Sequence, residues 1–143
     1  MNGTPTFPAE RLTKYPHMFP LDIAIWERFI DAHASDFSGF DYDIKVGTGT
    51  ESPESFGDNY ARMQAILSRY RIDVVGYKPD SLYIIEVKPE AGTVAIGQIE
   101  AYTRLYQRDY SPSLKLVGCI VTDRELPDMG YLTQVKGIEY YIV

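Results

Sequence analysis

The chain has 143 residues, a length that suits one domain with a sizeable core, and its formal net charge of −6 argues against a protein that coats nucleic acid indiscriminately. Its single cysteine permits no internal disulfide, and its two isolated histidines cannot complete a zinc site with that cysteine. The N-terminus lacks a signal-like pattern and no apolar run approaches membrane-spanning length, so we expect a reducing, cytoplasmic compartment and no membrane partner.

The sequence predicts an N-terminal arm and then a helix before the first long strand. Residues 1–20 contain four prolines and no hydrophobic period, which predicts an N-terminal arm, and residues 21–143 then form a single domain. From Leu21 to about Ala34, apolar residues recur at helical spacing and predict an amphipathic helix. Glu27 falls at the edge of its apolar stripe, a position that fits either a solvated flank or an acid with a chemical role.

Alternation predicts a strand, and basic residues follow it. Apolar and charged side chains alternate over residues 40–46, as in a strand with one solvated face. After a loop, residues 59–67 predict a short helix. Arg62, Arg69 and Arg71 make this part of the chain basic, so they are candidates for phosphate contacts, the alternative being an ordinary solvated face.

The next feature is a predicted β-hairpin. Two apolar runs of strand length, residues 72–77 and 82–87, are separated by a turn at Pro79-Asp80. If the hairpin is symmetric about this turn, Asp73 lies opposite Glu86 on the neighbouring strand.

Alternation along the hairpin also predicts which side chains share a face. It places Asp73, Glu86 and Lys88 on one face and Ile72 and Val74 on the other. Carboxylates held side by side raise each other's pKa unless a cation lies between them, and Mg²⁺ commonly binds through one or two carboxylates. The alternative is a set of solvated cross-strand ion pairs, each worth ~0.2–1 kcal/mol.

A second amphipathic helix is expected from about Val94 to Arg108, and it carries a polar residue on its apolar face. Gln98 points into the middle of that face. A buried amide without partners costs ~1–3 kcal/mol, so we expect Gln98 to have a polar role towards the hairpin. Tyr102 follows one turn later, where a core aromatic with a satisfied hydroxyl is the alternative to a functional role.

The remaining elements complete an α/β (α+β) pattern. Residues 114–121 are almost all apolar, as expected for a strand buried on both faces. Residues 123–136 predict a loop or a short helix, and residues 137–143 an edge strand. The order helix, three strands, helix, strand predicts an αβββαβ core in which helices flank a mixed central sheet.

Two motifs resemble those of a known superfamily. Asp73 with Glu86-Val87-Lys88 resembles the PD-(D/E)xK nucleases, in which an Asp on one strand precedes a Glu-x-Lys on the next. Ile72 stands where the name of the motif has proline. Gln98-Ile-Glu-Ala-Tyr102 resembles the Q-x-x-x-Y signature of the exonuclease-like branch of that superfamily. The resemblance implies a restriction-endonuclease-like fold.

The resemblance also implies a metal-dependent nuclease that hydrolyses phosphodiester bonds, with DNA as its expected partner and a phage or mobile element as a suitable context. Mg²⁺ or Mn²⁺ would be held by Asp73, Glu86 and the carbonyl of Val87, while Lys88 would orient or deprotonate the attacking water. The further expected contributions are Gln98 reaching towards the metal or substrate, Glu27 helping to hold a second ion, and Arg62, Arg69, Arg71 and Tyr102 binding nucleic acid.

Three alternatives remain open at the level of sequence. A catalytically silent relative would bind nucleic acid or a protein without cleaving it. A restriction-type enzyme would need a homodimer, because so short a chain leaves little room for reading bases. A small domain without a nucleic-acid role would use the charged hairpin only for ion pairs and would bind no divalent metal.

Overall fold

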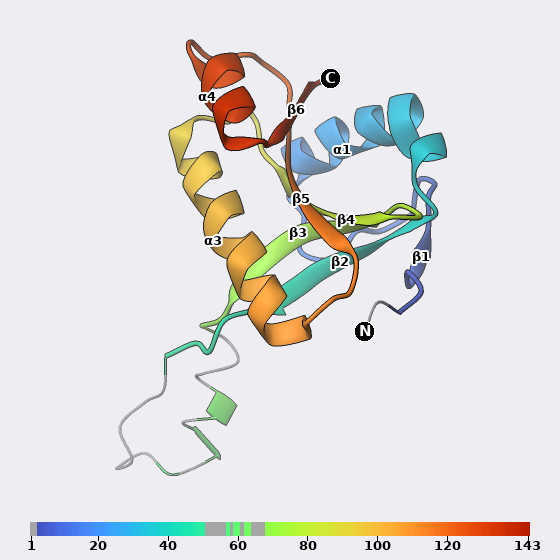
Figure 1. Ribbon diagram of the computed structural model, residues 1–143. Helices are drawn as coiled ribbons and strands as arrows, with labels where there is room; N and C mark the ends of the chain where they lie inside the picture. Colours follow the sequence, from blue (N-terminus) through green and yellow to red (C-terminus); the bar gives the residue numbers. More distant parts are fainter. Residues whose placement is uncertain (1–2, 51–56, 58, 61, 64–67) are drawn as a thin grey trace.

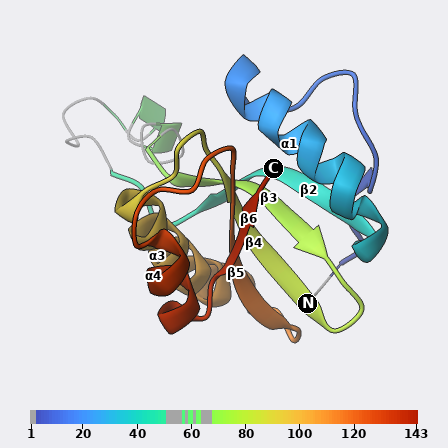
Figure 2. The ribbon, with the colours of Figure 1, turned by 90° about the horizontal axis from the view of Figure 1, so that it is seen from above.

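A computed structural model of the chain describes residues 3–50, 57, 59–60, 62–63 and 68–143. These residues form one six-stranded sheet in the order β1-β2-β3-β4-β5-β6, with helix α1 on one face and α3 on the other (Figures 1 and 2). The elements are β1 (Phe7–Pro8), α1 (Pro20–His33), the 3-10 turn η1 (Ala34–Asp36), β2 (Gly39–Val46), β3 (Tyr70–Tyr77), β4 (Ser81–Val87), α3 (Thr93–Tyr110), β5 (Lys115–Thr122), α4 (Met129–Lys136) and β6 (Glu139–Ile142).

The sheet is mixed, and the mixed α/β class expected from the sequence is confirmed. Strands β1 to β4 are antiparallel neighbours, whereas β4, β5 and β6 are parallel. Parallel neighbours need a crossover, and α3 supplies it between β4 and β5. The segment expected as a loop or short helix contains α4, and β6 lies at the edge of the sheet beside it (Figure 1).

The sheet separates two hydrophobic cores. One core packs against α1 and is rich in aromatic rings, among them Trp26 and Phe29, neither of which is exposed to solvent. The other packs against α3 around Ile99 and Ile120. All seven residues of β4 are buried, because this central strand is covered by a helix on each face.

Strands β2 and β3 do not keep one face throughout, which corrects the expected alternation. Val74 lies in the core on the α1 side, but Ile72 lies in the core on the α3 side. Asp43 adopts a positive φ of 56°, and the pairing between β2 and β3 omits Asp43 and Asp73. Such a left-handed residue interrupts the pleat, so the strands change face at this point.

The N-terminal segment is part of the packed structure. Phe7–Pro8 pairs with β2, and Tyr15 is buried in the core on the α1 side. The short helix expected over residues 59–67 lies largely outside the described residues. Among the helices that the structure describes, none is both long enough and apolar enough to cross a membrane.

Candidate metal and catalytic site

Asp73 and Glu86 meet on the central hairpin. The pairing between β3 and β4 reaches Val74 opposite Ile85, which is the register expected from the sequence. Asp73 and Glu86 occupy the next positions, and their carboxyl groups share a hydrogen bond. Glu86 is only 9% exposed, so this pair of acids is largely removed from water.

Burial changes the protonation of both acids. Burial first, and then the negative charge of Asp73 and the hydrogen bond with it, raise the pKa of Glu86 to about 9. Burial raises the pKa of Asp73 to about 6. The backbone N–H of Val87 donates to Asp73 Oδ2 at 2.9 Å, and this hydrogen bond opposes the rise by lowering the pKa. At neutral pH the pair therefore holds one shared proton, with Asp73 as the more acidic member.

Lys88 stands next to this pair at the end of β4. Its backbone N–H donates to the carbonyl of Val121 at 3.0 Å and so continues the pairing with β5. Its ammonium charge lowers the pKa of Glu86, although less than burial and Asp73 raise it. The structure thus brings together the Asp and the Glu-x-Lys predicted from the sequence.

A third acid, Asp22, approaches the pair from the first turn of α1. Its negative charge raises the pKa of both Asp73 and Glu86, and its own pKa is raised by burial, while the N–H of Phe19 and the charge of Lys88 lower it. Asp22 is not among the site residues predicted from the sequence. It precedes the buried Ile25 and Trp26 by three and four residues, so helical spacing placed it on the inward face.

Glu27, the helix acid predicted for the site, is engaged elsewhere. Its carboxylate accepts a hydrogen bond from the hydroxyl of Tyr15 at 3.1 Å and lies 3.5 Å from the guanidinium of Arg11. Both partners belong to the N-terminal segment. Glu27 therefore ties that segment to α1, and the structure gives Asp22 the position next to the carboxyl pair.

Helix α3 turns Gln98 and Tyr102 towards the carboxyl pair. The charges of Glu86 and Asp73 raise the pKa of the Tyr102 phenol beyond the effect of burial, and a hydrogen bond from Gln98 opposes that rise. Among the described residues, Oε1 of Gln98 is buried without a hydrogen-bond partner. A buried acceptor left unpaired is unusual and fits a group that awaits a ligand or water.

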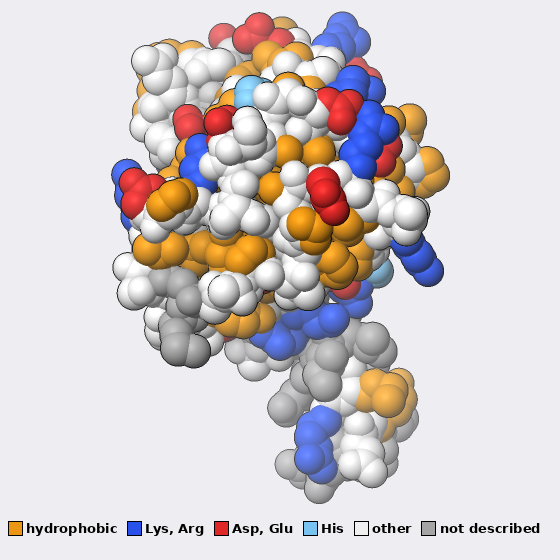
Figure 3. Space-filling view, turned by 90° about the vertical axis from the view of Figure 1, so that its right-hand side faces the viewer, with side chains coloured by type: hydrophobic (Ala, Val, Ile, Leu, Met, Phe, Trp, Pro, Cys, Tyr) orange, Lys and Arg blue, Asp and Glu red, His pale blue; other side chains and the backbone are white. Residues whose placement is uncertain are grey.

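Two of the three arginines predicted to contact phosphate form ion pairs with acids, and the third, Arg62, donates a hydrogen bond to Oδ1 of Asn59 at 3.5 Å. Arg69 donates from Nε to the carbonyl of Gly47 at 2.6 Å and lies 3.7 Å from Asp109. Arg71 lies 3.4 Å from Asp43, the residue at the change of strand face. Arg62 is exposed. The face of the molecule in Figure 3 accordingly shows charges of both signs between hydrophobic side chains, without a broad basic surface.

The carboxyl pair suits a hard divalent cation better than zinc. Within the described ranges, no group of three or more His, Cys, Asp or Glu side chains is placed to hold a metal ion. Mg²⁺ commonly needs only one or two carboxylates, because waters and substrate phosphates complete its shell. The oxygens of Asp73 and Glu86 are the hard donors that Mg²⁺ and Mn²⁺ prefer, and the two carboxyl groups are close enough to share a hydrogen bond, so this donor set suits such an ion.

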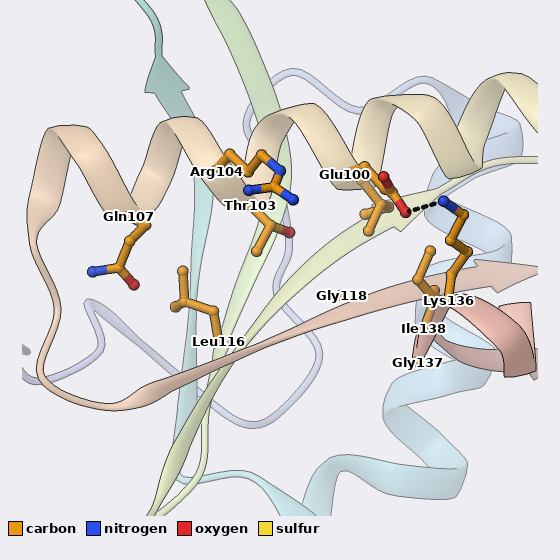
Figure 4. A pocket seen from close by; sticks show the side chains of 10 residues that line it. Glu100, Thr103, Arg104, Gln107, Leu116, Gly118, Lys136, Gly137 and Ile138 are labelled. Atoms are coloured by element: carbon orange, nitrogen blue, oxygen red, sulfur yellow. Dashed lines mark ion pairs between the residues drawn. The ribbon is translucent and has the colours of Figure 1, made fainter.

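A hollow lies on another side of α3. It has a volume of about 540 Å³ and runs between α3, β5 and the end of α4 (Figure 4). Lys136 closes one end with an ion pair to Glu100 at 3.3 Å. None of the predicted site residues lines this hollow, so it is separate from the chemistry on the hairpin.

No known protein family, curated protein or solved structure matches the chain. The likeness to the PD-(D/E)xK nucleases therefore depends on residues alone. Asp73, the run Glu86-Val87-Lys88 and the pair Gln98 and Tyr102 make up that likeness, and all of them lie within one region of the structure.

Proposed function

We propose that the chain is a metal-dependent nuclease of the PD-(D/E)xK kind, with a restriction-endonuclease-like fold, that hydrolyses phosphodiester bonds in DNA. The observation that carries the proposal is the buried Asp73 and Glu86 pair with Lys88 beside it. Two acids sharing one proton in a desolvated place are costly to maintain, and such perturbed groups concentrate at functional sites.

The arrangement of elements also supports the proposal. Helix α1, strands β2 to β4, helix α3 and strand β5 follow one another in the αβββαβ order, and the sheet is mixed. The two helices lie on opposite faces of the sheet, and each carries a side chain that interacts electrostatically with the carboxyl pair, Asp22 on α1 and Tyr102 on α3.

Each side chain has a distinct role in this proposal. The N–H of Val87 fixes Asp73, and Glu86 completes the pair that, with the carbonyl of Val87, would hold Mg²⁺ or Mn²⁺. Such an ion, when bound, would supply stabilisation of the charge that develops on the scissile phosphate. Lys88 would orient the attacking water by donating a hydrogen bond to it as an ammonium, or would accept its proton as the neutral amine.

Gln98 and Tyr102 complete the side of the site formed by α3. The free Oε1 of Gln98 would accept a hydrogen bond from water or substrate at the carboxyl pair. The hydrogen bond from the same amide to Tyr102 holds it in place. Both residues would therefore orient the reacting groups, with the acids and Lys88 nearest to the reaction.

The test combines metal binding with cleavage. Mn²⁺ and Mg²⁺ are titrated calorimetrically into the wild type, Asp73→Asn and Glu86→Gln, and cleavage of single- and double-stranded DNA and RNA is assayed for these proteins and Lys88→Ala. We expect both carboxylate variants to lose metal binding and all three variants to lose cleavage. Asp80→Asn, on the exposed turn of the same hairpin, is the matched control and should behave as the wild type.

A second candidate is a catalytically silent protein of the same fold. The ion pairs of Arg69 with Asp109 and of Arg71 with Asp43 favour this second candidate, because they leave few cationic side chains to bind phosphate. Metal binding without cleavage of any nucleic acid would support this candidate. Wild-type protein that binds no divalent cation would refute the nuclease and leave the acids as structural groups.

A further inference from the structure

An exposed aromatic ring stands beside the carboxyl site. Tyr70, the first residue of β3, is 57% exposed. Its ring lies 5.7 Å from that of Tyr102, centroid to centroid, at an angle of 35°. A Cβ at Gly47, where φ is +87°, would stand 3.4 Å from Cδ2 of Tyr70, so the ring also rests against this backbone. The ring is thus held in place while more than half of the side chain meets solvent.

Tyr102 connects this ring to the acids. Its phenol lies close enough to Glu86 and Asp73 for their charges to act on it, and its ring packs beside Tyr70. Tyr70 is therefore one aromatic ring away from the carboxyl pair. A group resting on Tyr70 would have its neighbouring atoms within reach of the site.

The charge distribution argues against a site that grips duplex DNA by its backbone. The net charge is −6, and the arginines nearest to Tyr70, Arg69 and Arg71, are paired with Asp109 and Asp43. Proteins that bind a duplex gain most of their affinity by neutralising phosphates with lysine and arginine side chains. Arg69 and Arg71 are already paired with acids, so they are less able to do this. Affinity here must come from another contact, and stacking of bases on aromatic rings is the usual one for single strands.

Resting on the proposed function, we propose that Tyr70 is a base-stacking platform and that the site takes single-stranded nucleic acid. In a duplex, the faces of the bases are covered by their neighbours, whereas an unpaired base can place its face on an exposed ring. The phosphate next to a base on Tyr70 would then face Glu86, Asp73 and Lys88.

The test measures binding without catalysis. Fluorescence anisotropy of a labelled oligothymidylate and of a labelled blunt-ended duplex is followed in EDTA with the wild-type chain, Tyr70→Ala and Tyr70→Phe. We expect Tyr70→Ala to bind the single strand about 5- to 150-fold more weakly, the range measured for loss of one stacked base, and Tyr70→Phe to bind it as the wild type does. Binding of the duplex should be weak and should not depend on Tyr70.

The matched control is Tyr131→Ala. Tyr131 is 68% exposed on α4, which lies beside the edge strand β6, so it tests whether any exposed tyrosine has the same effect. Thermal unfolding of each variant shows that the fold is retained. Tyr70→Trp gives a direct signal, because the single natural tryptophan, Trp26, is fully buried, and stacking should quench the new indole.

Three outcomes overturn the proposal: no binding of oligothymidylate by the wild type, equal binding by Tyr70→Ala, or an equal loss in Tyr131→Ala. Because the measurements exclude divalent cations, they are independent of cleavage. Stacking on Tyr70 without cleavage would leave the platform standing and refute the nuclease. Cleavage by a protein whose binding of the single strand does not depend on Tyr70 would support the nuclease and refute the platform.

Discussion

At the scale of single residues, the decisive feature is a pair of acids that burial keeps partly protonated. Glu86 and Asp73 share a hydrogen bond, and burial raises the pKa of Glu86 to about 9 and that of Asp73 to about 6. The charged groups that act on Glu86 are Asp73 and Asp22, which raise its pKa, and Lys88, which lowers it. A cation would remove the conflict, since it stabilises both ionised carboxylates.

This pair makes stability depend on pH. The folded protein retains the Glu86 proton up to about pH 9, whereas the unfolded chain loses it near pH 4.5, so the folded state binds more protons between these values. The free energy of unfolding of the metal-free protein must therefore fall as pH rises through this window. We expect Glu86→Gln to be more stable than the wild type at pH 8 by more than about 1.4 kcal/mol, the value of one pKa unit.

Urea unfolding at several pH values checks this prediction. Glu86→Gln should show a flatter profile, and Mn²⁺ should raise the stability of the wild type at pH 8 but not that of the variant. A wild-type profile that is flat from about pH 5 to about pH 9, a range that lies within the window named above, would contradict the buried, proton-sharing pair.

Asp22 and Glu27 give a second test at the same scale. Asp22 acts on the carboxyl pair, and Glu27 contacts Tyr15 and Arg11. Asp22→Asn should weaken Mn²⁺ binding about tenfold or more, as loss of a supporting group near a metal site does. Glu27→Gln is the matched control and should leave Mn²⁺ affinity unchanged in calorimetry. The opposite ranking would return Glu27 to the site.

At the scale of elements, close packing of α3 on β5 sets the distance between the helix and the hairpin. A Cβ at Gly118 in β5 would lie 2.5 Å from Cγ2 of Ile99, whose side chain is only 1% exposed. The same helix carries Gln98, directly before Ile99. Glycine at this position thus lets the helix approach closely enough for its polar residues to reach the acids.

Gly118→Ala should therefore destabilise the protein by about 1–3 kcal/mol, as overpacking of a core does. Gly97→Ala, on α3 itself, is the matched control, because a Cβ there would meet nothing within 4 Å. It should stabilise the protein by about 0.5–1 kcal/mol, since alanine is the better helix former. The midpoints of urea unfolding for the two variants measure these changes in stability. Equal effects would mean that the contact with Ile99 relaxes without cost.

At the scale of the whole molecule, the net charge is negative, and many of the basic side chains are paired with nearby acids. Six of the 14 lysines and arginines form ion pairs with acids of the described chain. They are Arg11, Arg69, Arg71, Arg108, Arg124 and Lys136. A molecule with this distribution can neutralise only a few phosphates at one time.

Binding of oligothymidylate should therefore depend weakly on salt. About three neutralised phosphates correspond to a slope near −2 in a plot of log affinity against log salt concentration. Anisotropy titrations at several salt concentrations measure this slope. A slope of about −6 or steeper would mean that a larger basic surface grips the strand and that stacking is not the main contact.

The sequence alone determined the elements and the register of the hairpin. Helical spacing predicted a helix from Leu21 to about Ala34, which the structure has at Pro20–His33, and alternation predicted a strand over residues 40–46, which it has at Gly39–Val46. Symmetry about the turn predicted the hairpin register, which is observed at Val74 opposite Ile85. These features depend on residues close together in the chain. Gln98 could be selected for the same reason, since its position on an apolar face follows from its neighbours.

Only the tertiary structure decided which distant residues join the acids. It replaced Glu27 by Asp22, paired Arg69 with Asp109, and turned Ile72 to the α3 side at the interruption next to Asp43. These outcomes depend on how helices lie across the sheet and on where a strand changes face. Local periodicity does not encode such long-range packing, and therefore the exposed Tyr70 beside Tyr102 became recognisable only in the folded chain.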